Sequence, residues 1–289
     1  MSKKVTREQL IEMITNDEDV QFVDTSEITD MSGLFRWKRK FNQDISRWNV
    51  SNVRNMEYMF SEARSFNGDI SRWDTSNVTN MGYMFDNAAA FNQDIGGWDV
   101  SNVRNIEGMF YEAEAFNQDL SGWDVSNVTN MNGVFIRARS FDQDLSRWNV
   151  SNVRNMEGVF YEAIAFNEDI SGWDVSSVTN MSFMFNEASS FNQDISNWDV
   201  SNVRSMDGMF SGATTFNQDL SKWDVSNVMN MMDMFNGSGV CHVYELAKKM
   251  KGKTRKNIKR MIGDRIWDEV KNIDPSKVDA YLKMRKINE

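Results

Sequence analysis

Hydrophobic residues recur along most of the chain with a period of 25 residues. The stretch FNQDISRWNVSNVRNMEYMF begins at Phe41, and close copies of it begin at Phe66, Phe91, Phe116, Phe141, Phe166, Phe191 and Phe216. A fixed period of this length is typical of a solenoid, in which each coil buries its apolar face against its neighbours. The pattern therefore predicts eight full coils of equal length, in which equivalent residues stack in columns.

Three aromatic columns are expected to form the structural core. Tryptophan recurs at Trp48, Trp73, Trp98, Trp123, Trp148, Trp173, Trp198 and Trp223. Beside the column of Phe41, a second phenylalanine column runs from Phe35 through Phe60 to Phe235. Because burial explains every copy equally well, core packing is favoured over a cofactor-binding stripe, and we expect no cofactor.

The spacing within each unit predicts a short strand followed by a helical turn. Trp48 and Val50 are two residues apart, which is typical of a strand over DISRWNV. Val53, Met56, Met59, Phe60 and Ala63 then follow at intervals of three and four residues, which indicates a helical turn. The expected fold class is an α/β repeat solenoid with leucine-rich-repeat-like coils and helical caps at both ends.

Two polar columns are expected to form a structural ladder. One begins at Asn42 and recurs as Asn67, Asn92, Asn117, Asn167, Asn192 and Asn217, with Asp142 as the one substitution. Buried amides that bond the backbone of the next coil would explain it. The other is Asp44, Asp69, Asp94, Asp119, Asp144, Asp169, Asp194 and Asp219. Stacked carboxylates must face solvent, accept turn hydrogen bonds or share a cation; turn bonding is favoured over a calcium ladder, for which no glycine-rich loop is present.

A weaker period of 50 residues overlies the first. Arg54, Arg104, Arg154 and Arg204 alternate with Thr79, Thr129 and Thr179, and each arginine precedes an acidic residue by three positions. On a helical turn, this spacing predicts local ion pairs such as Arg54 with Glu57.

The ends of the chain depart from the repeat. We expect an N-terminal helical cap over residues 1–22, a solenoid with a partial first unit over 23–240, and a basic helical segment over 241–289. In the first cap, Thr6 and Gln9 form a capping-box pattern before Leu10, Ile11 and Ile14, which are predicted to share one helical face. In the last segment, a helical stripe comprises Ile258, Met261, Ile262, Ile266 and Val270, and Asp274 precedes Pro275 as a helix cap.

Charge is unevenly distributed between these parts. The net charge of -10 combines fourteen basic and seven acidic residues from Cys241 onward with eighteen basic and thirty-five acidic residues before it. A basic segment of this kind could bind nucleic acid or an anionic membrane surface, but attraction to its own acidic array is the favoured interpretation.

The repeated FNQDISGWDVSNVTNM, followed by MF and preceded by VDTSEITDMSGLF, closely resembles the BspA-like leucine-rich repeat family over Val23 to Phe235. This family of 25-residue repeats was first noted in mycoplasma surface lipoproteins and is also found in other bacteria, some protists and large DNA viruses. The resemblance implies a solenoid without an enzymatic role that serves in surface attachment or protein interaction. The basic segment lies outside the resemblance.

These observations predict a non-enzymatic scaffold that binds an unknown protein partner. The residues expected to contact it break the uniformity of two columns with bulky side chains: Tyr58, Tyr83, Tyr111, Ile136 and Tyr161. A structural rod, monomeric or weakly self-associating, is the alternative. Cys241 and His242 are the only residues of their kinds, and adjacent residues seldom form a catalytic dyad. No signal peptide or transmembrane segment is recognisable, so a cytoplasmic location is expected, or the cell surface if the chain is a fragment.

Overall fold

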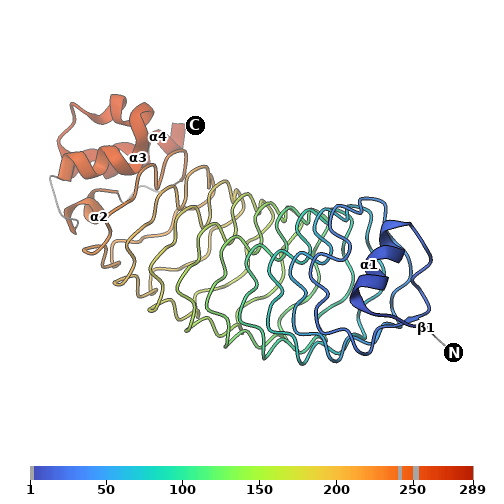
Figure 1. Cartoon of the computed structure of the whole chain (residues 1–289). Helices are drawn as coiled ribbons and strands as arrows, with labels where there is room; N and C mark the ends of the chain where they lie inside the picture. Colours follow the sequence, from blue (N-terminus) through green and yellow to red (C-terminus); the bar gives the residue numbers. More distant parts are fainter. Residues whose placement is uncertain (1–2, 240–242, 250–253, 289) are drawn as a thin grey trace.

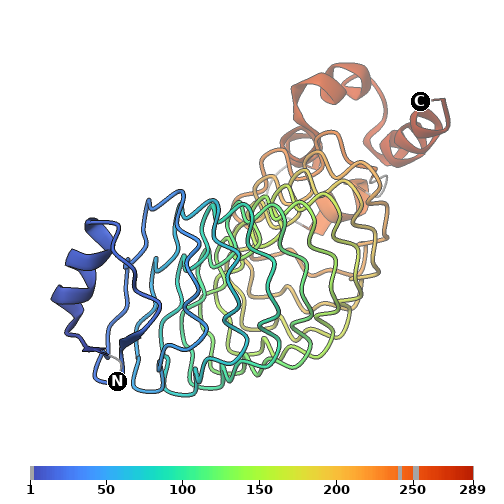
Figure 2. The same ribbon diagram turned by 90° about the vertical axis from the view of Figure 1, so that its right-hand side faces the viewer.

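The computed structural model describes residues 3–239, 243–249 and 254–288 and shows an elongated solenoid with helices at its two opposite ends (Figure 1). Successive coils lie side by side along the long axis, as the view turned by 90° also shows (Figure 2). Isolated parallel bridges join the coils in one continuous line from Asp30 through Asn55 to Asn230. The expectation of a repeat solenoid therefore holds.

The interior of the solenoid is a stack of aromatic rings. All eight tryptophans of the repeat are between 1% and 4% exposed, and the column from Phe35 to Phe235 is buried throughout. Rings of this column stack at intervals of about 5.3 to 5.8 Å, as for Phe60 and Phe85 at 5.6 Å. Phe41 is only half-buried, because it begins its column and no earlier ring of that column covers it; it stacks on Phe35 at 3.8 Å.

The predicted strand and helical turn inside each coil are wrong. Between residues 25 and 239, all of which the structure describes, no helix or extended strand is present. Around Trp48 the chain makes a turn, in which the amide of Trp48 donates to the carbonyl of Ile45 at 3.1 Å. A strand cannot form there because turns on both sides of Trp48 and Val50 use the backbone groups.

In place of the helical turn, each coil has consecutive tight turns that alternate with bonds to the next coil. The amides of Met56, Tyr58 and Phe60 donate to carbonyls one coil further on, at 2.8 to 2.9 Å. The amide of Met59 donates to Met56 within the same coil, which closes a four-residue turn. Side chains consequently follow a two-in, two-out pattern, which has the same intervals of three and four as a buried helical face.

The N-terminal end is covered by helix α1 (Arg7–Thr15) and a parallel pair of strands, β1 (Lys3–Lys4) and β2 (Val23–Asp24). Thr6 and Gln9 form the predicted capping box. Leu10 and Ile14 are buried, but Ile11 is 37% exposed, contrary to expectation. Ile11 follows Leu10 by about 100° around the helix and therefore points away from the buried stripe.

The C-terminal end is covered by α2 (Val243–Lys249), α3 (Thr254–Val270), the 3-10 helix η1 (Pro275–Lys277) and α4 (Val278–Asn288). The predicted stripe of α3 is buried, and Asp274 caps η1 as expected. The carbonyl of Met261 accepts from the amide of Phe235 at 2.8 Å, and that of Arg260 accepts from Asp233. A kinked segment of α3 thus takes the place that a further coil would occupy.

Candidate interaction surface

The two-in, two-out pattern creates one surface whose side chains vary from coil to coil. We define the turn face as positions 57, 58, 61 and 62 and their equivalents at 25-residue intervals. Its outward side chains are not needed for the core, so they can change without disturbing the stacked rings. All five residues expected to contact a partner lie on this face and are partly exposed.

Two columns of the turn face, those of Tyr58 and Glu62, have left-handed backbone. In the column of Tyr58, φ lies between 53° and 64° in every coil, and five of its nine residues are glycine: Gly33, Gly108, Gly133, Gly158 and Gly208. Tyr58, Tyr83 and Phe183 carry aromatic side chains in the same conformation. Bulky residues rarely adopt positive φ, and the conformation costs roughly 1–2 kcal/mol. These three aromatic side chains are therefore retained against the local backbone preference.

The first predicted cluster forms a stack near the N-terminal end. The rings of Tyr58 and Tyr83 lie parallel, with centroids 4.9 Å apart. The guanidinium of Arg36 continues the stack, because it lies 4.2 Å from the ring centroid of Tyr58 and 4.3 Å from that of Trp37. Trp37 is 63% exposed, so this end of the turn face presents an aromatic and cationic surface to solvent.

Tyr83 is fixed on both sides of its ring. Opposite Tyr58 it lies on Gly108, where a Cβ atom would come within 2.3 Å of the ring. Its hydroxyl donates to Oε1 of Glu107 at 2.9 Å. Burial raises the pKa of Tyr83 well above its usual value, and the hydrogen bond to Glu107 raises it further. The phenol therefore stays a hydrogen-bond donor at physiological pH.

The second predicted cluster surrounds a hollow of about 380 Å³ in the middle of the array. Tyr111, Ile136 and Tyr161 all line it, together with Phe183, which is not among the predicted contact residues. Phe183 is 40% exposed and its ring meets Tyr161 edge to face, with centroids 6.5 Å apart. Its place in the column of Tyr58 and Tyr83 was the signal that could have identified it.

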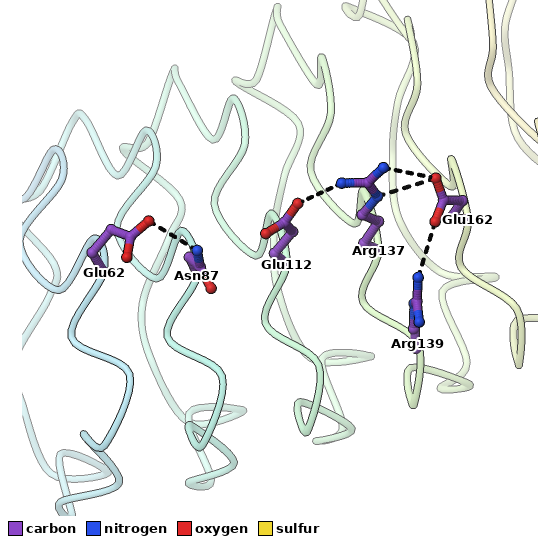
Figure 3. Close-up of polar contacts among 6 residues, drawn as sticks. All are labelled: Glu62, Asn87, Glu112, Arg137, Arg139 and Glu162. Carbon is purple, nitrogen blue, oxygen red and sulfur yellow. Dashed lines mark hydrogen bonds and ion pairs between the residues drawn. The ribbon is translucent and has the colours of Figure 1, made fainter. Parts of the chain in front are cut away.

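A charged ladder runs along the column of position 62 (Figure 3). Asn87 donates to Glu62 at 2.9 Å, and Arg137 donates to Glu112 at 2.7 Å and to Glu162 at 3.1 Å. Donors thus alternate with acceptors over five coils. Partial burial raises the pKa of Glu162, but hydrogen bonds from Arg137 and from Arg139 outweigh it, so the pKa lies below its usual value. Between Glu62 and Glu162, the alternation keeps like charges from stacking directly.

The predicted ion pairs between the arginines of the fifty-residue period and the following acidic residues are not formed among the described residues. Instead, Glu107 accepts from Asn130 and Asn132, at 2.9 and 3.0 Å, and Glu157 accepts from Asn180 at 2.8 Å. The prediction of these ion pairs is wrong because it assumed a helical turn, in which residues three apart lie on the same face.

The polar ladder bonds the backbone, as expected. Oδ1 of Asn67 accepts from the amide of Asn92 in the next coil at 2.9 Å, although most of these amides are exposed rather than buried. In the aspartate column, Oδ1 of Asp44 accepts from the amide of Ser46 at 3.0 Å. Hydrogen bonds from Ser46 lower the pKa of Asp44, and those from Ser121 lower the pKa of Asp119 in the same way. Within the part of the chain that the structure describes, no group of three acidic, histidine or cysteine side chains is arranged to hold a metal ion.

Two basic residues of the last segment donate hydrogen bonds to the array itself. Nζ of Lys249 donates to the carbonyl of Trp223 at 3.0 Å, and Arg260 donates to the carbonyl of Met229 at 3.0 Å. Hydrogen bonds from Ser226 lower the pKa of Asp224, and the charge of Lys249 lowers it further. Cys241 and His242, considered as a dyad, lie outside the described residues.

Comparison with known proteins identifies a family. Three overlapping stretches of the chain, residues 5–121, 91–176 and 144–250, match the family described as "Mycoplasma protein of unknown function, DUF285". No curated protein matches the chain. Among the described residues, none of the helices combines the length and the apolar character needed to cross a membrane. Because the matched stretches together cover most of the chain, we conclude that it belongs to the DUF285 family.

Proposed function

We propose that the chain is a non-enzymatic repeat scaffold whose turn face binds a protein partner. The observation that carries the proposal is the presence of Tyr58, Tyr83 and Phe183 in left-handed backbone, where most equivalent positions have glycine. Strained conformations persist where the side chain has a use that offsets the local cost. Tyrosine and phenylalanine are favoured anchors in protein interfaces, which is consistent with partner binding.

The resemblance to BspA-like repeats supports the same proposal, because attachment at a surface would also require a binding face. The proposal includes a likeness to leucine-rich repeats only in the stacking of 25-residue coils. The cytoplasmic location and the absence of catalysis stay predictions.

The internal contacts of Lys249 and Arg260 favour a capping role for the basic segment over nucleic-acid binding. Cations that already bond carbonyl groups of the array are less available for phosphate groups. We therefore place the partner site on the turn face and not on residues 241–289.

The test is affinity capture from the native host with the full chain and two variants. One variant carries Tyr58→Ala, Tyr83→Ala, Tyr111→Ala and Tyr161→Ala on the turn face. The matched control carries Arg47→Ala, Arg72→Ala, Arg147→Ala and Lys222→Ala, which are exposed residues elsewhere on the coils. We expect a partner that the control retains and the turn-face variant loses, with both variants folded by circular dichroism. Equal retention by the two variants would contradict the proposal.

A further inference from the structure

The fifty-residue period allows two equivalent places on the turn face to be compared. At the first, the ring of Tyr83 covers Gly108, and its hydroxyl and the side-chain amide of Asn132 both donate to Oε1 of Glu107. Asn130 donates to Oε2 of the same carboxylate at 2.9 Å. Both oxygens of Glu107 therefore have partners from within the chain.

Fifty residues further on, the ring is missing. Gly133 occupies the position equivalent to Tyr83, Gly158 is equivalent to Gly108, and Glu157 is equivalent to Glu107. Oε2 of Glu157 accepts from Asn180, as Glu107 does from Asn130, but no described residue donates to Oε1. Ser182, which replaces Asn132, instead bonds Ser205 at 2.8 Å.

The hollow of about 380 Å³ lies at this place and is lined by Glu157 and Gly158. The end of the Ile136 side chain enters the space between the two glycines, where its Cδ1 lies 3.0 and 3.2 Å from the positions that Cβ atoms at Gly133 and Gly158 would occupy. Around it, Tyr111, Tyr161 and Phe183 supply aromatic walls, and Glu157 supplies a carboxylate at the edge. The hollow thus combines apolar walls with one unused hydrogen-bond acceptor.

We propose that this hollow binds a tyrosine side chain of a basic peptide segment in a partner protein, with the phenol hydroxyl donating to Oε1 of Glu157. This inference rests on the proposed function of the turn face and specifies the chemistry of its partner. Tyr83 is the template, because it shows that a phenol ring fits beside a glycine of this column and reaches the following glutamate at 2.9 Å.

Charge argues that the partner segment is basic. Glu157 lines the hollow, and Glu112 and Glu162 contact Arg137, which is the one basic residue of its lining. Arg137 is already held between Glu112 and Glu162. Glu162 also has Arg139 as a partner. A lysine or arginine near the tyrosine of the partner would therefore complement the charge of Glu157.

The backbone indicates recognition through side chains. The amides of Gly133 and Gly158 donate to carbonyls of the following coil at 2.8 and 2.9 Å. These amides are not free to pair with an added strand, so the partner peptide does not extend a sheet on this face. Affinity must come from the anchor ring, its hydrogen bond and the surrounding charges.

The test is selection from a displayed library of random peptides against the full chain, followed by fluorescence anisotropy with the selected peptides. We expect peptides with one recurrent tyrosine and a net positive charge. Replacing that tyrosine by phenylalanine, or introducing Glu157→Gln, should weaken binding by about tenfold or more, since each removes a hydrogen bond to a charged group.

Two further variants localise the site. Gly133→Tyr introduces a ring at the position equivalent to Tyr83 and should abolish binding, whereas Ile164→Ser, an exposed change outside the hollow, should leave binding within about twofold. The Glu157→Gln variant and the peptide substitution keep the test valid if Gly133→Tyr does not fold.

The results that would overturn the proposal are distinct from failure of the proposed function. Peptides without tyrosine, or peptides unaffected by Glu157→Gln, would overturn the tyrosine site, even if they are lost in the variant that removes Tyr58 and Tyr83. A dimer in light scattering that Glu157→Gln dissociates would assign the hollow to a second copy and also overturn it. A library that yields no binding peptide would overturn the tyrosine site. The turn face would be rejected as a binding surface only if the affinity capture also found no partner that depends on it.

Discussion

The indole Nε1 of Trp98 donates a hydrogen bond to the carbonyl oxygen of Ile70, in the preceding coil, at 3.0 Å. The same carbonyl accepts from the backbone amide of Trp73 in its own coil at 3.2 Å. The equivalent indole bond recurs in all eight tryptophans of the repeat, from Trp48 to Trp223. The tryptophan column thus joins neighbouring coils by hydrogen bonds as well as by ring contacts.

Replacing Trp98 by phenylalanine should destabilise the array. The change removes a buried hydrogen bond and part of a buried ring, which together should cost about 2–4 kcal/mol in the free energy of unfolding. Unfolding in guanidinium, followed by circular dichroism, measures the change. Trp37→Phe is the matched control, because Trp37 is 63% exposed, and it should alter stability by less than about 0.5 kcal/mol. Equal effects at the two positions would contradict the role of the indole bond.

Gly108→Ala should be destabilising for two reasons. Its φ of +57° disfavours any Cβ, and that Cβ would lie 2.3 Å from the ring of Tyr83. We expect a loss of more than about 1 kcal/mol in the free energy of unfolding. Gly97→Ala is the control, because Gly97 has no positive φ and no atom within 4 Å of the added Cβ. The prediction fails if the two variants unfold at the same denaturant concentration.

The aspartate ladder should make the fold sensitive to acid. Hydrogen bonds from the following serines lower the pKa of residues such as Asp44, Asp119 and Asp144 below the ordinary value of 3.8. Their contribution to stability is therefore complete above the ordinary pKa and is lost as the pH falls through the lowered one. The melting temperature should be constant from about pH 7 to 5 and should fall below about pH 4.

Asparagine variants isolate this contribution. Asn49 and Asn149 belong to another column of the coil and accept the same kind of bond, from the backbone amides of Ser51 and Ser151. Asp119→Asn combined with Asp144→Asn should therefore keep the melting temperature at neutral pH and lessen its fall in acid. Glu12→Gln combined with Glu114→Gln removes the same number of charges elsewhere. An acid response that the asparagine pair leaves unchanged would contradict the prediction.

The ion pairs of Arg137 should stabilise the array modestly and in a salt-dependent way. Its side chain is 39% exposed, so solvent screens its contacts with Glu112 and Glu162. Arg137→Gln should cost at most about 1 kcal/mol at low ionic strength, and less in 1 M NaCl (about 3 Å screening length). Arg154→Gln, at an exposed arginine of the fifty-residue period, should have no such salt dependence. Urea unfolding at the two salt concentrations measures both variants.

The helix α3 should protect the last coil from association. Met261 is 1% exposed, and its carbonyl accepts from the amide of Phe235. Met261→Asp should displace α3, expose the rings of the last coil, and increase the mass measured by size-exclusion chromatography with light scattering. Met229→Asp, at a side chain that is 62% exposed, should leave the mass unchanged. An unchanged mass for Met261→Asp would show that the last coil needs no cover.

Much of the candidate surface was accessible from the sequence, because Tyr58, Tyr83, Tyr111, Ile136 and Tyr161 interrupt otherwise regular columns. Column position alone could not show that Tyr58 and Tyr83 stack, or that Phe183 joins Tyr161 around the hollow. Those contacts depend on the left-handed backbone of the column. A positive φ at a tyrosine cannot be predicted from the residue type, because tyrosine rarely adopts this conformation.

The sequence by itself determined the period, the coil length and the identity of the core columns, because an unbroken repeat requires equivalent residues to meet across neighbouring coils. Only the tertiary structure decided how each coil is closed. Intervals of three and four at Val53, Met56 and Met59 suit a helix and a series of tight turns equally well, since both bury the same side chains. The amide of Met56 donates to the carbonyl of Asn80 in the next coil, and such bonds exist only once the coils are stacked.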